Sequence, residues 1–315
     1  MKYIGVDIGG TQVKIGIVDE NGVVSKSMAY DVAFDGYETP IIETVVSSLA
    51  EFMKFNKLEE SQINGIGVSS TGLIDPIEGR VVASAGHLKA WAGCNIREKI
   101  GHVYRGPVTV MNDANCAALA EHWIGGAKDY SDAVVLTIGT GIGGGIISNS
   151  EVICGTAGGA GEIGHITIRN NGRRCCCGNI GCYEQYASAT ALIRMVTKAQ
   201  KDGKLDQGLF VQHKIDGRSV FEAVGKDVNL DAILAKWIGY VADGIISLIH
   251  TLSPQVVLVG GGVSTQKEKF IDPLRKKVLS QVMPVYAGAV KLEAASLGND
   301  AGMVGAVYYC RKHSI

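Results

Sequence analysis

Short apolar segments separated by glycine turns dominate the start of the chain. Residues 3–8 (YIGVDI) and 12–19 (QVKIGIVD) have the composition of strands, and Gly9-Gly10-Thr11 lies between them. Glu20-Asn21-Gly22 is a turn signal, and residues 23–30 (VVSKSMAY) read as a third strand. The pattern predicts β-hairpins arranged around a glycine-rich turn.

Helical and strand patterns alternate along the rest of the chain. A helix is expected over residues 39–55, with Thr39 as its N-cap and Pro40 as its first residue. Further helices are expected at 114–126, 187–200, 230–252 and 299–309. Buried strands are expected at 63–70, 107–113 and 254–264. Such alternation is typical of an α/β protein.

The opening pattern recurs once at an offset of 130 residues. Residues 134–153 (VVLTIGTGIGGGIISNSEVI) align with the segment that begins at Ile4. The alignment places Asp7 on Thr137, Gly9 on Gly139, Thr11 on Gly141, Ile17 on Ile147 and Asp19 on Asn149. Two copies of strand, glycine turn and strand predict a duplicated domain with a cleft between its halves.

Composition narrows the class of protein. The formal net charge is −1, which gives no reason to expect nucleic acid or an anionic membrane as a partner. The N-terminus enters a strand pattern at once, without the features of a signal peptide, and no apolar run approaches a membrane span. We therefore expect a cytoplasmic protein whose cysteines are reduced, so that clustered thiols indicate metal or catalysis before disulfides.

Three glycine loops follow apolar strands: DIGGT from Asp7, TIGTGIGGG from Thr137 and LVGGGVS from Leu258. Glycine lets backbone N–H groups approach a phosphate closely, and Asp7 can hold Mg²⁺ directly or through water. Each loop alone could be a hairpin turn or a strand-to-helix connection. The pairing of the first two favours a phosphate site, although neither loop fits the P-loop or the dinucleotide-binding pattern.

The MNDAN stretch puts Asp113 at the end of a strand and the start of a helix. Ligands of α/β sheets bind at such ends, and a carboxylate there can accept the proton of a hydroxyl that attacks phosphorus. The competing interpretation is that Asn112 or Asp113 caps the helix.

The segment from Gly161 to Gln185 contains half of the eight cysteines. His165, Cys175, Cys177 and Cys182 have the spacing H-x9-C-x-C-x4-C, and three thiolates with one imidazole make a closed, structural zinc set. In an extended segment Cys176 would point away from its neighbours, which makes it the bystander. Buried free thiols beside an unrelated histidine are the alternative.

Glu162 and Glu184 flank this cluster. A bound metal would fix both segments, so that the carboxylates could accept hydrogen bonds from vicinal sugar hydroxyls. Otherwise they are solvated surface glutamates. His87 and Trp91 lie in the loop before the strand that ends at Asp113, where they either border a substrate or belong to a plain surface loop.

DIGGT, NDAN, TIGTGIGGG, GEIGH and C-x-CGxxGCxE occur here in the order and spacing of the ROK family (repressors, open reading frames and sugar kinases), which the chain resembles over nearly its whole length. The resemblance implies an α/β, two-lobed actin-like ATPase (ribonuclease-H-like) fold with an inter-lobe cleft. The small lobe would comprise residues 1–115 plus 299–315, and the large lobe residues 116–298 with the zinc-binding segment.

The same resemblance implies an ATP-dependent kinase that phosphorylates the 6-hydroxyl of a hexose, with Asp113 as catalytic base. The implied sugar ligands are Gly72, Asn112, Asp113, Glu162, His165 and Glu184. The implied ATP and Mg²⁺ contacts are Asp7, Gly9, Gly10, Thr11, Lys14, Thr137, Gly139, Thr140, Gly141, Gly260, Gly261 and Gly262. Structural Zn²⁺ would be held by His165, Cys175, Cys177 and Cys182. A homodimer is also implied.

Two departures bear on the substrate and the metal. Family glucokinases often carry Asn-Leu where this chain has His87-Leu88, so N-acetylmannosamine stands beside glucose as the expected sugar. Cys176 stands where the family varies, so the choice of Cys175 and Cys177 rests on spacing. The cysteine cluster argues against a beta-glucoside kinase.

Two other classes remain open. The first is a sugar-responsive regulator without its DNA-binding domain, since family repressors carry a helix-turn-helix before the first strand and here that strand begins at residue 3. The second is a non-catalytic actin-like ATPase module.

Overall fold

The computed structural model describes residues 1–33, 39–84, 88, 90–210 and 214–313. The chain divides into two compact units. The first comprises residues 1–129, 145–161 and 297–315, and the second comprises residues 130–144 and 162–296. His87 lies outside the described residues.

The first sheet has five strands in the order β3-β2-β1-β4-β7. Its strands are β1 (Lys2–Ile8), β2 (Gln12–Asp19), β3 (Val24–Asp31), β4 (Ile66–Ser70) and β7 (Val108–Asn112). β1 to β3 form an antiparallel meander, whereas β4 and β7 run parallel to β1. The parallel strands β1, β4 and β7 therefore all end at one edge of the sheet, where Asp7, Ser69 and Asn112 lie.

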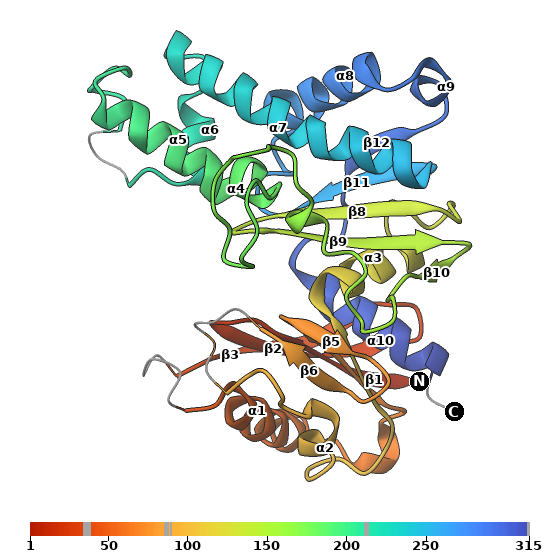
Figure 1. The fold of residues 1–315 in the computed structure, drawn as a ribbon. Helices are drawn as coiled ribbons and strands as arrows, with labels where there is room; N and C mark the ends of the chain where they lie inside the picture. The colour runs from red at the N-terminus through yellow and green to blue at the C-terminus, as the bar shows by residue number, and fades with distance from the viewer. Residues whose placement is uncertain (34–38, 85–87, 89, 211–213, 314–315) are drawn as a thin grey trace. The chain divides into compact units, whose positions relative to one another are not determined.

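Helices flank this sheet on two sides (Figure 1). α1 (Ile41–Phe55) and α2 (Ile96–Ile100) lie on one side and α10 (Ala301–His313) on the other. α10 approaches the sheet so closely that a Cβ at Gly67 would come within 2.2 Å of the Ala306 carbonyl oxygen. α10 also packs on α3 (Asp113–Trp123), because Gly305 lies against the Cys116 carbonyl. Glycine at position 305 thus allows the backbones of α10 and α3 to pack closely.

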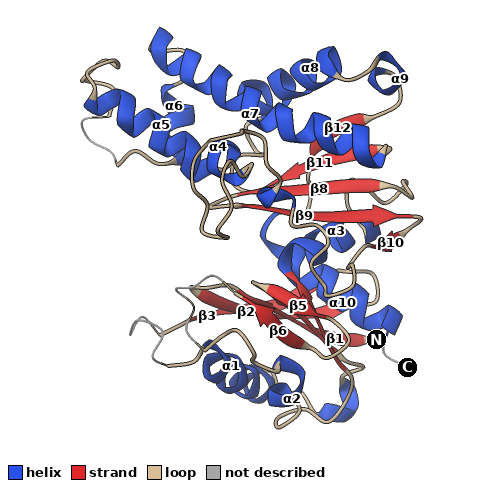
Figure 2. Ribbon diagram, in the orientation of Figure 1, coloured by secondary structure: helices blue, strands red, loops and turns tan. Residues whose placement is uncertain are grey.

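The second sheet repeats the topology of the first. Its order is β10-β9-β8-β11-β12, and its strands are β8 (Ala133–Ile138), β9 (Ile142–Ser148), β10 (Glu151–Val152), β11 (Val256–Gly260) and β12 (Lys291–Ala294). β8 pairs in parallel with β11, and β11 pairs with β12. The internal repeat seen in the sequence is therefore a repeat of sheet order, which Figure 2 shows in red.

The helices of the second unit bury its core. They are α4 (Glu184–Ala187), α5 (Ala189–Lys201), α6 (Gly217–Ala223), α7 (Val228–Leu252), α8 (Asp272–Gln281) and α9 (Pro284–Ala287). Trp237 of α7 packs against Phe221 and Phe270 at the centre of this core. By length and composition α7 could cross a membrane, and half of its most apolar stretch is buried within the protein, as in the core helix of a globular unit.

The sequence patterns locate the main strands and long helices, but several details differ. The first helix begins at Ile41 and not at Pro40, because Pro40 is extended (φ −60°, ψ 136°) and occupies the N-cap position itself. The strand expected to continue to Ser264 ends at Gly260. The short strands β5 (Leu73–Asp75) and β6 (Arg80–Ala83), and the helices α2, α4, α6, α8 and α9, are too short or too weakly periodic to be predicted.

Candidate functional site: a thiol–histidine cluster and glycine loops at strand ends

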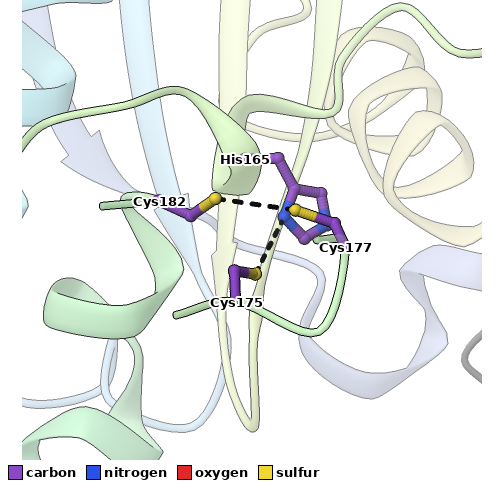
Figure 3. A group of neighbouring side chains, drawn as sticks. All are labelled: His165, Cys175, Cys177 and Cys182. Atoms are coloured by element: carbon purple, nitrogen blue, oxygen red, sulfur yellow. Dashed lines mark hydrogen bonds between the residues drawn. The ribbon is translucent and has the colours of Figure 1, made fainter. Parts of the chain in front are cut away.

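Four side chains of the second unit converge on one point (Figure 3). The ligand atoms of His165, Cys175, Cys177 and Cys182 all lie within 4.8 Å of one another. The Cys175 sulfur lies 3.5 Å from Nδ1 of His165, and the Cys177 and Cys182 sulfurs are 3.6 Å apart. All four thiols of the segment are free, so no disulfide explains the cluster.

These distances fit a tetrahedral metal. Two sulfurs bound to one zinc lie about 3.8 Å apart, and a sulfur and a nitrogen lie about 3.6 Å apart. The donor set of three sulfurs and one nitrogen is also one that zinc prefers in closed structural sites. The residues present therefore fit a zinc ion that fills all its coordination positions with protein.

A tight turn, not an extended strand, brings the thiols together. The Gly178 N–H donates to the Cys175 carbonyl at 3.1 Å, and Arg174 bridges to Ile180 beyond the turn. Gly178 has φ of +92° and Gly181 has φ of +86°, a region that favours glycine. Cys175 and Cys177 lie in the same cluster, as predicted. The prediction assumed an extended segment, however, and the structure has a turn at this position.

The thiols of the cluster influence one another's ionisation. Burial alone would raise the pKa of Cys175, but hydrogen bonds from Cys177, Cys182 and His165 outweigh it and lower the pKa to about 7. Burial, and then the hydrogen bonds and charges of Cys177 and Cys175, raise the pKa of Cys182 to about 12. Of these two thiols, Cys175 therefore loses its proton more readily, and thiolates are the form in which cysteines bind a metal ion.

Cys176 lies outside the tetrahedral group. Its side chain is exposed, and it forms a second cluster with Cys175 and Glu184. Burial raises the pKa of Cys176, with further contributions from Cys175 and Glu184, so the neutral thiol is favoured there.

His165 links the thiol cluster to the first of the two flanking acids. Its Nδ1 faces Cys175, and its Nε2 lies 3.8 Å from the carboxylate of Glu162, which is half exposed. Residues Ile163–His165 form one 3₁₀ turn, which sets the histidine three residues after the glutamate on the same side. One imidazole can therefore bind a metal through Nδ1 and offer Nε2 to a ligand.

Glu184 is the first residue of α4 and follows soon after Cys182 in the chain. Its carboxylate accepts the Ile142 N–H at 3.2 Å and lies against Gly141, where a Cβ would come within 2.2 Å of it. The second flanking acid is thus held against the glycine loop between β8 and β9. The structure brings Glu162, His165 and Glu184 into the same unit around the thiol cluster.

Two glycine loops meet at the ends of β8 and β11. Thr137 is the register partner of Gly260, so the two strands end side by side. Between β8 and β9 the turn closes through a bond from Gly139 N–H to the Gly141 carbonyl at 3.0 Å, and Thr140 is exposed at its tip. Gly262 follows in the second loop, where a Cβ would meet no atom within 4 Å.

Gly261 is the residue that allows this close approach. Its φ is +89°, and a Cβ there would come within 2.1 Å of the Ile138 carbonyl oxygen. The backbone of this loop therefore lies directly on the end of β8, so the two glycine loops are adjacent.

The DIGGT turn belongs to the first unit. The Asp7 carboxylate accepts a hydrogen bond from the Ser69 hydroxyl at 2.7 Å, and Lys14 is its cross-strand partner. Burial raises the pKa of Asp7, and Ser69 and Lys14 partly offset this increase. Gly9 closes the turn by donating to the Gln12 carbonyl, which leaves Gly10 and Thr11 at its tip, with Thr11 exposed.

Ser69 is a residue that the sequence reasoning missed. It is buried at the end of β4 and is the register partner of Asp7 on β1. The signal was present, because the strand INGIGVSS ends in two hydroxyl residues beside the strand that ends in DIGGT.

Asn112 and Asp113 have different local roles. Asn112 is the N-cap of α3: its side-chain oxygen accepts the N–H groups of Ala114 and Asn115, and its Nδ2 donates to the Gly72 carbonyl at 2.9 Å. Asp113 follows as the first helical residue and is exposed, with one carboxylate oxygen 2.8 Å from the Ala114 nitrogen. Because Asn112 is the N-cap residue, helix capping does not explain why an aspartate stands at position 113.

Trp91 belongs to the core of the first unit. It is 1% exposed, and its indole N–H donates to the Thr71 carbonyl at 3.1 Å. The hypothesis that Trp91 borders a substrate is wrong, because the ring is enclosed and holds the backbone next to Gly72.

Two matched mixed sheets, each with a glycine loop after its first strand, define an α/β protein of the actin-like ATPase type. The chain belongs to the ROK family, whose model matches residues 3–313.

Several known proteins are similar to nearly the whole of this chain. A glucokinase of Thermotoga maritima is 31% identical over 312 residues, 97% of this chain and 96% of that protein. A glucokinase of Streptomyces griseus, solved with glucose and AMPPNP, is 30% identical with a TM-score of 0.83, covering 99% and 100% of the two chains. A putative N-acetylmannosamine kinase of Listeria monocytogenes is 28% identical with a TM-score of 0.82, over 100% of both chains. A putative xylose repressor of Caldicellulosiruptor is 29% identical over 96% of this chain and 76% of its own length.

Proposed function

We propose that this protein is an ATP-dependent hexose kinase that phosphorylates the 6-hydroxyl of glucose or N-acetylmannosamine. The observation that carries the proposal is the double role of His165, whose Nδ1 faces the thiol cluster while its Nε2 faces Glu162. A metal bound at the thiol cluster would fix the position of His165 and of the neighbouring Glu162, and fixed carboxylates suit the recognition of a polyhydroxylated ligand such as a sugar. The glucose and AMPPNP bound to the Streptomyces griseus relative support glucose and ATP as substrates.

The proposed sugar ligands are found in each of the two units. Glu162, His165 and Glu184 of the second unit would take its hydroxyls, since carboxylates accept from vicinal hydroxyls and the imidazole Nε2 adds a further polar contact. Asn112 and the backbone at Gly72 would take hydroxyls in the first unit. A zinc ion at His165, Cys175, Cys177 and Cys182 would fix the conformation of this segment and supply no open coordination position for chemistry.

Asp113 would act as the base. As the first residue of α3 it presents an exposed carboxylate beside the cap residue Asn112. It would orient the 6-hydroxyl and accept its proton as the hydroxyl oxygen attacks the γ-phosphorus of ATP. The reaction forms the sugar 6-phosphate and ADP.

The nucleotide would be bound by the glycine loops. The turns at residues 9–11 and 139–141 would contact phosphate oxygens, with the exposed Thr11 and Thr140 at their tips, and the loop of residues 260–262 would take the nucleoside part. Asp7, supported by Ser69 and Lys14, would hold Mg²⁺ directly or through water. The magnesium ion would neutralise charge that develops on the phosphates.

A coupled assay of ADP release tests the proposal. The purified, zinc-replete protein is supplied with ATP, Mg²⁺ and one of glucose, mannose, N-acetylmannosamine, N-acetylglucosamine, fructose or cellobiose. Glucose or N-acetylmannosamine should give turnover far above the sugar-free rate. Sugar binding without ADP release would instead indicate a sugar-responsive regulator, and ATP hydrolysis indifferent to sugar would indicate an ATPase module. Either result contradicts the proposal.

A further inference from the structure

Two arginines of the second unit share one backbone oxygen. Arg173 donates from Nη1 to the Gln185 carbonyl at 2.6 Å, and Arg194 of α5 donates from Nη2 to the same oxygen. Gln185 lies on α4, and Arg194 lies on the next helix, α5. The two helices are side by side (Figure 1), so Arg194 can reach the carbonyl to which Arg173 donates. Because both guanidinium groups contact one atom, their nitrogens lie no more than about 5 Å apart.

Neither guanidinium has an acidic partner within the part of the chain that the structure describes. Arg169, on the same segment as Arg173, forms an ion pair with Asp243 at 3.7 Å, whereas no ion pair to Arg173 or Arg194 is formed by a described residue. Two like charges at this spacing repel each other, and their shared carbonyl offsets only part of that repulsion. Burial, and then the charge of Arg173, lower the pKa of Arg194.

The pair is also prearranged. The Arg173 guanidinium lies over the Tyr186 ring at 4.7 Å, and its backbone N–H donates to the Tyr186 hydroxyl at 2.7 Å. Each guanidinium carries five N–H donors in a rigid fork, and only one nitrogen of each is engaged by Gln185. Donors remain on both groups, in the paired arrangement that suits the oxygens of a phosphate.

We propose that Arg173 and Arg194 form a binding site for a phosphate group, separate from the glycine loops. The ligand class is a small phosphate-bearing anion, either inorganic or carried by a sugar. Anion binding at this site would also change the conformation of the sugar-binding segment; this part of the inference rests on the proposed function. Gln185 directly follows Glu184, and its side-chain Nε2 lies 3.8 Å from the Cys175 sulfur. An anion that draws the guanidiniums away from the Gln185 carbonyl would loosen this turn.

Direct binding tests the site without any need for turnover. Inorganic phosphate, tripolyphosphate and glucose 6-phosphate are titrated separately by calorimetry into zinc-replete protein saturated with AMPPNP, Mg²⁺ and sugar, so that the glycine loops are filled. Ionic strength is held constant with chloride. Arg194→Gln removes one guanidinium from the pair, and Lys201→Gln, which removes a charge from the exposed side of the same helix, is the matched control.

We expect at least one of the three anions to bind the wild type, and Arg194→Gln to weaken it about 10-fold while Lys201→Gln has no effect. Comparison of inorganic phosphate and tripolyphosphate with glucose 6-phosphate shows whether the site prefers inorganic or sugar-borne phosphate. Binding that is equal in all three proteins, or absent from the wild type, would overturn the site. Because the readout is binding, a protein that binds anions but phosphorylates no sugar would refute the proposed function and leave this site standing.

Discussion

The Nδ1 atom of His165 lies 3.5 Å from the sulfur of Cys175. This contact makes one imidazole part of the thiol cluster and leaves its other nitrogen beside Glu162. The cysteine-rich segment is therefore best understood as a support for the residues around it. Single substitutions should separate the groups that support the site from the groups that act on the substrates.

Cys177→Ser should abolish zinc binding, whereas Cys176→Ser should not. Cys177 belongs to the tetrahedral group, and Cys176 is exposed outside it. Elemental analysis should give about one zinc per chain for the wild type and Cys176→Ser, and almost none for Cys177→Ser. Equal zinc content in the two variants would show that the ligand set is different.

Removal of the metal should lower thermal stability and sugar affinity together. The four ligands come from a segment with little regular structure, so a bound ion contributes folding free energy to it. A strong chelator should lower the Tm by several degrees and raise the sugar Kd, and added zinc should restore both. If sugar affinity survives complete removal of zinc, the ion does not support the sugar ligands.

Asp7→Asn should make the fold more stable but the enzyme less active. Burial raises the pKa of Asp7, so the folded state favours the protonated carboxyl and loses stability as pH rises from the ordinary aspartate range through the raised pKa. Asparagine removes this pH dependence and keeps an oxygen for Ser69. Chemical denaturation near neutral pH should show the gain in stability, and turnover should fall because the variant lacks the carboxylate that we propose holds Mg²⁺. A variant that is both less stable and fully active would contradict this role.

Gly261→Ala should weaken nucleotide binding selectively. The φ of +89° and the nearby Ile138 carbonyl oxygen leave no room for a Cβ, so the loop must move. We expect the KM for ATP to rise about 10-fold with little change in the KM for sugar. Gly217→Ala is the control, because a Cβ there meets no atom within 4 Å. If the KM for ATP rises equally in both variants, or if only the KM for sugar rises in Gly261→Ala, the nucleotide binds elsewhere.

The sequence predicts most of the fold where a local pattern carries the information. The duplicated strand and glycine-turn pattern anticipates two sheets of the same order, and the H-x9-C-x-C-x4-C spacing anticipates the thiol cluster. Spacing is informative here because the four ligands lie within one short segment.

Relationships between distant segments were not predictable in the same way. Ser69 meets Asp7 only because β1 and β4 are parallel neighbours. Arg173 and Arg194 meet only because both donate to the Gln185 carbonyl of α4, which contacts α5. The burial of Trp91 and the N-cap position of Pro40 differ from the prediction for a related reason. Both burial and backbone angles depend on tertiary packing. Neither is encoded in the residue types alone.

The most direct test of the proposed mechanism compares the wild type with Asp113→Asn in one preparation, measuring zinc content, sugar Kd and sugar-dependent ADP release. Asparagine can still accept the Ala114 N–H, so the start of α3 should be unchanged. We expect normal zinc, a similar sugar Kd and a kcat lower by about 10²- to 10⁴-fold, as is usual when a general base is lost. Near-normal turnover in Asp113→Asn, with sugar and zinc bound, would contradict the role of Asp113 as the base.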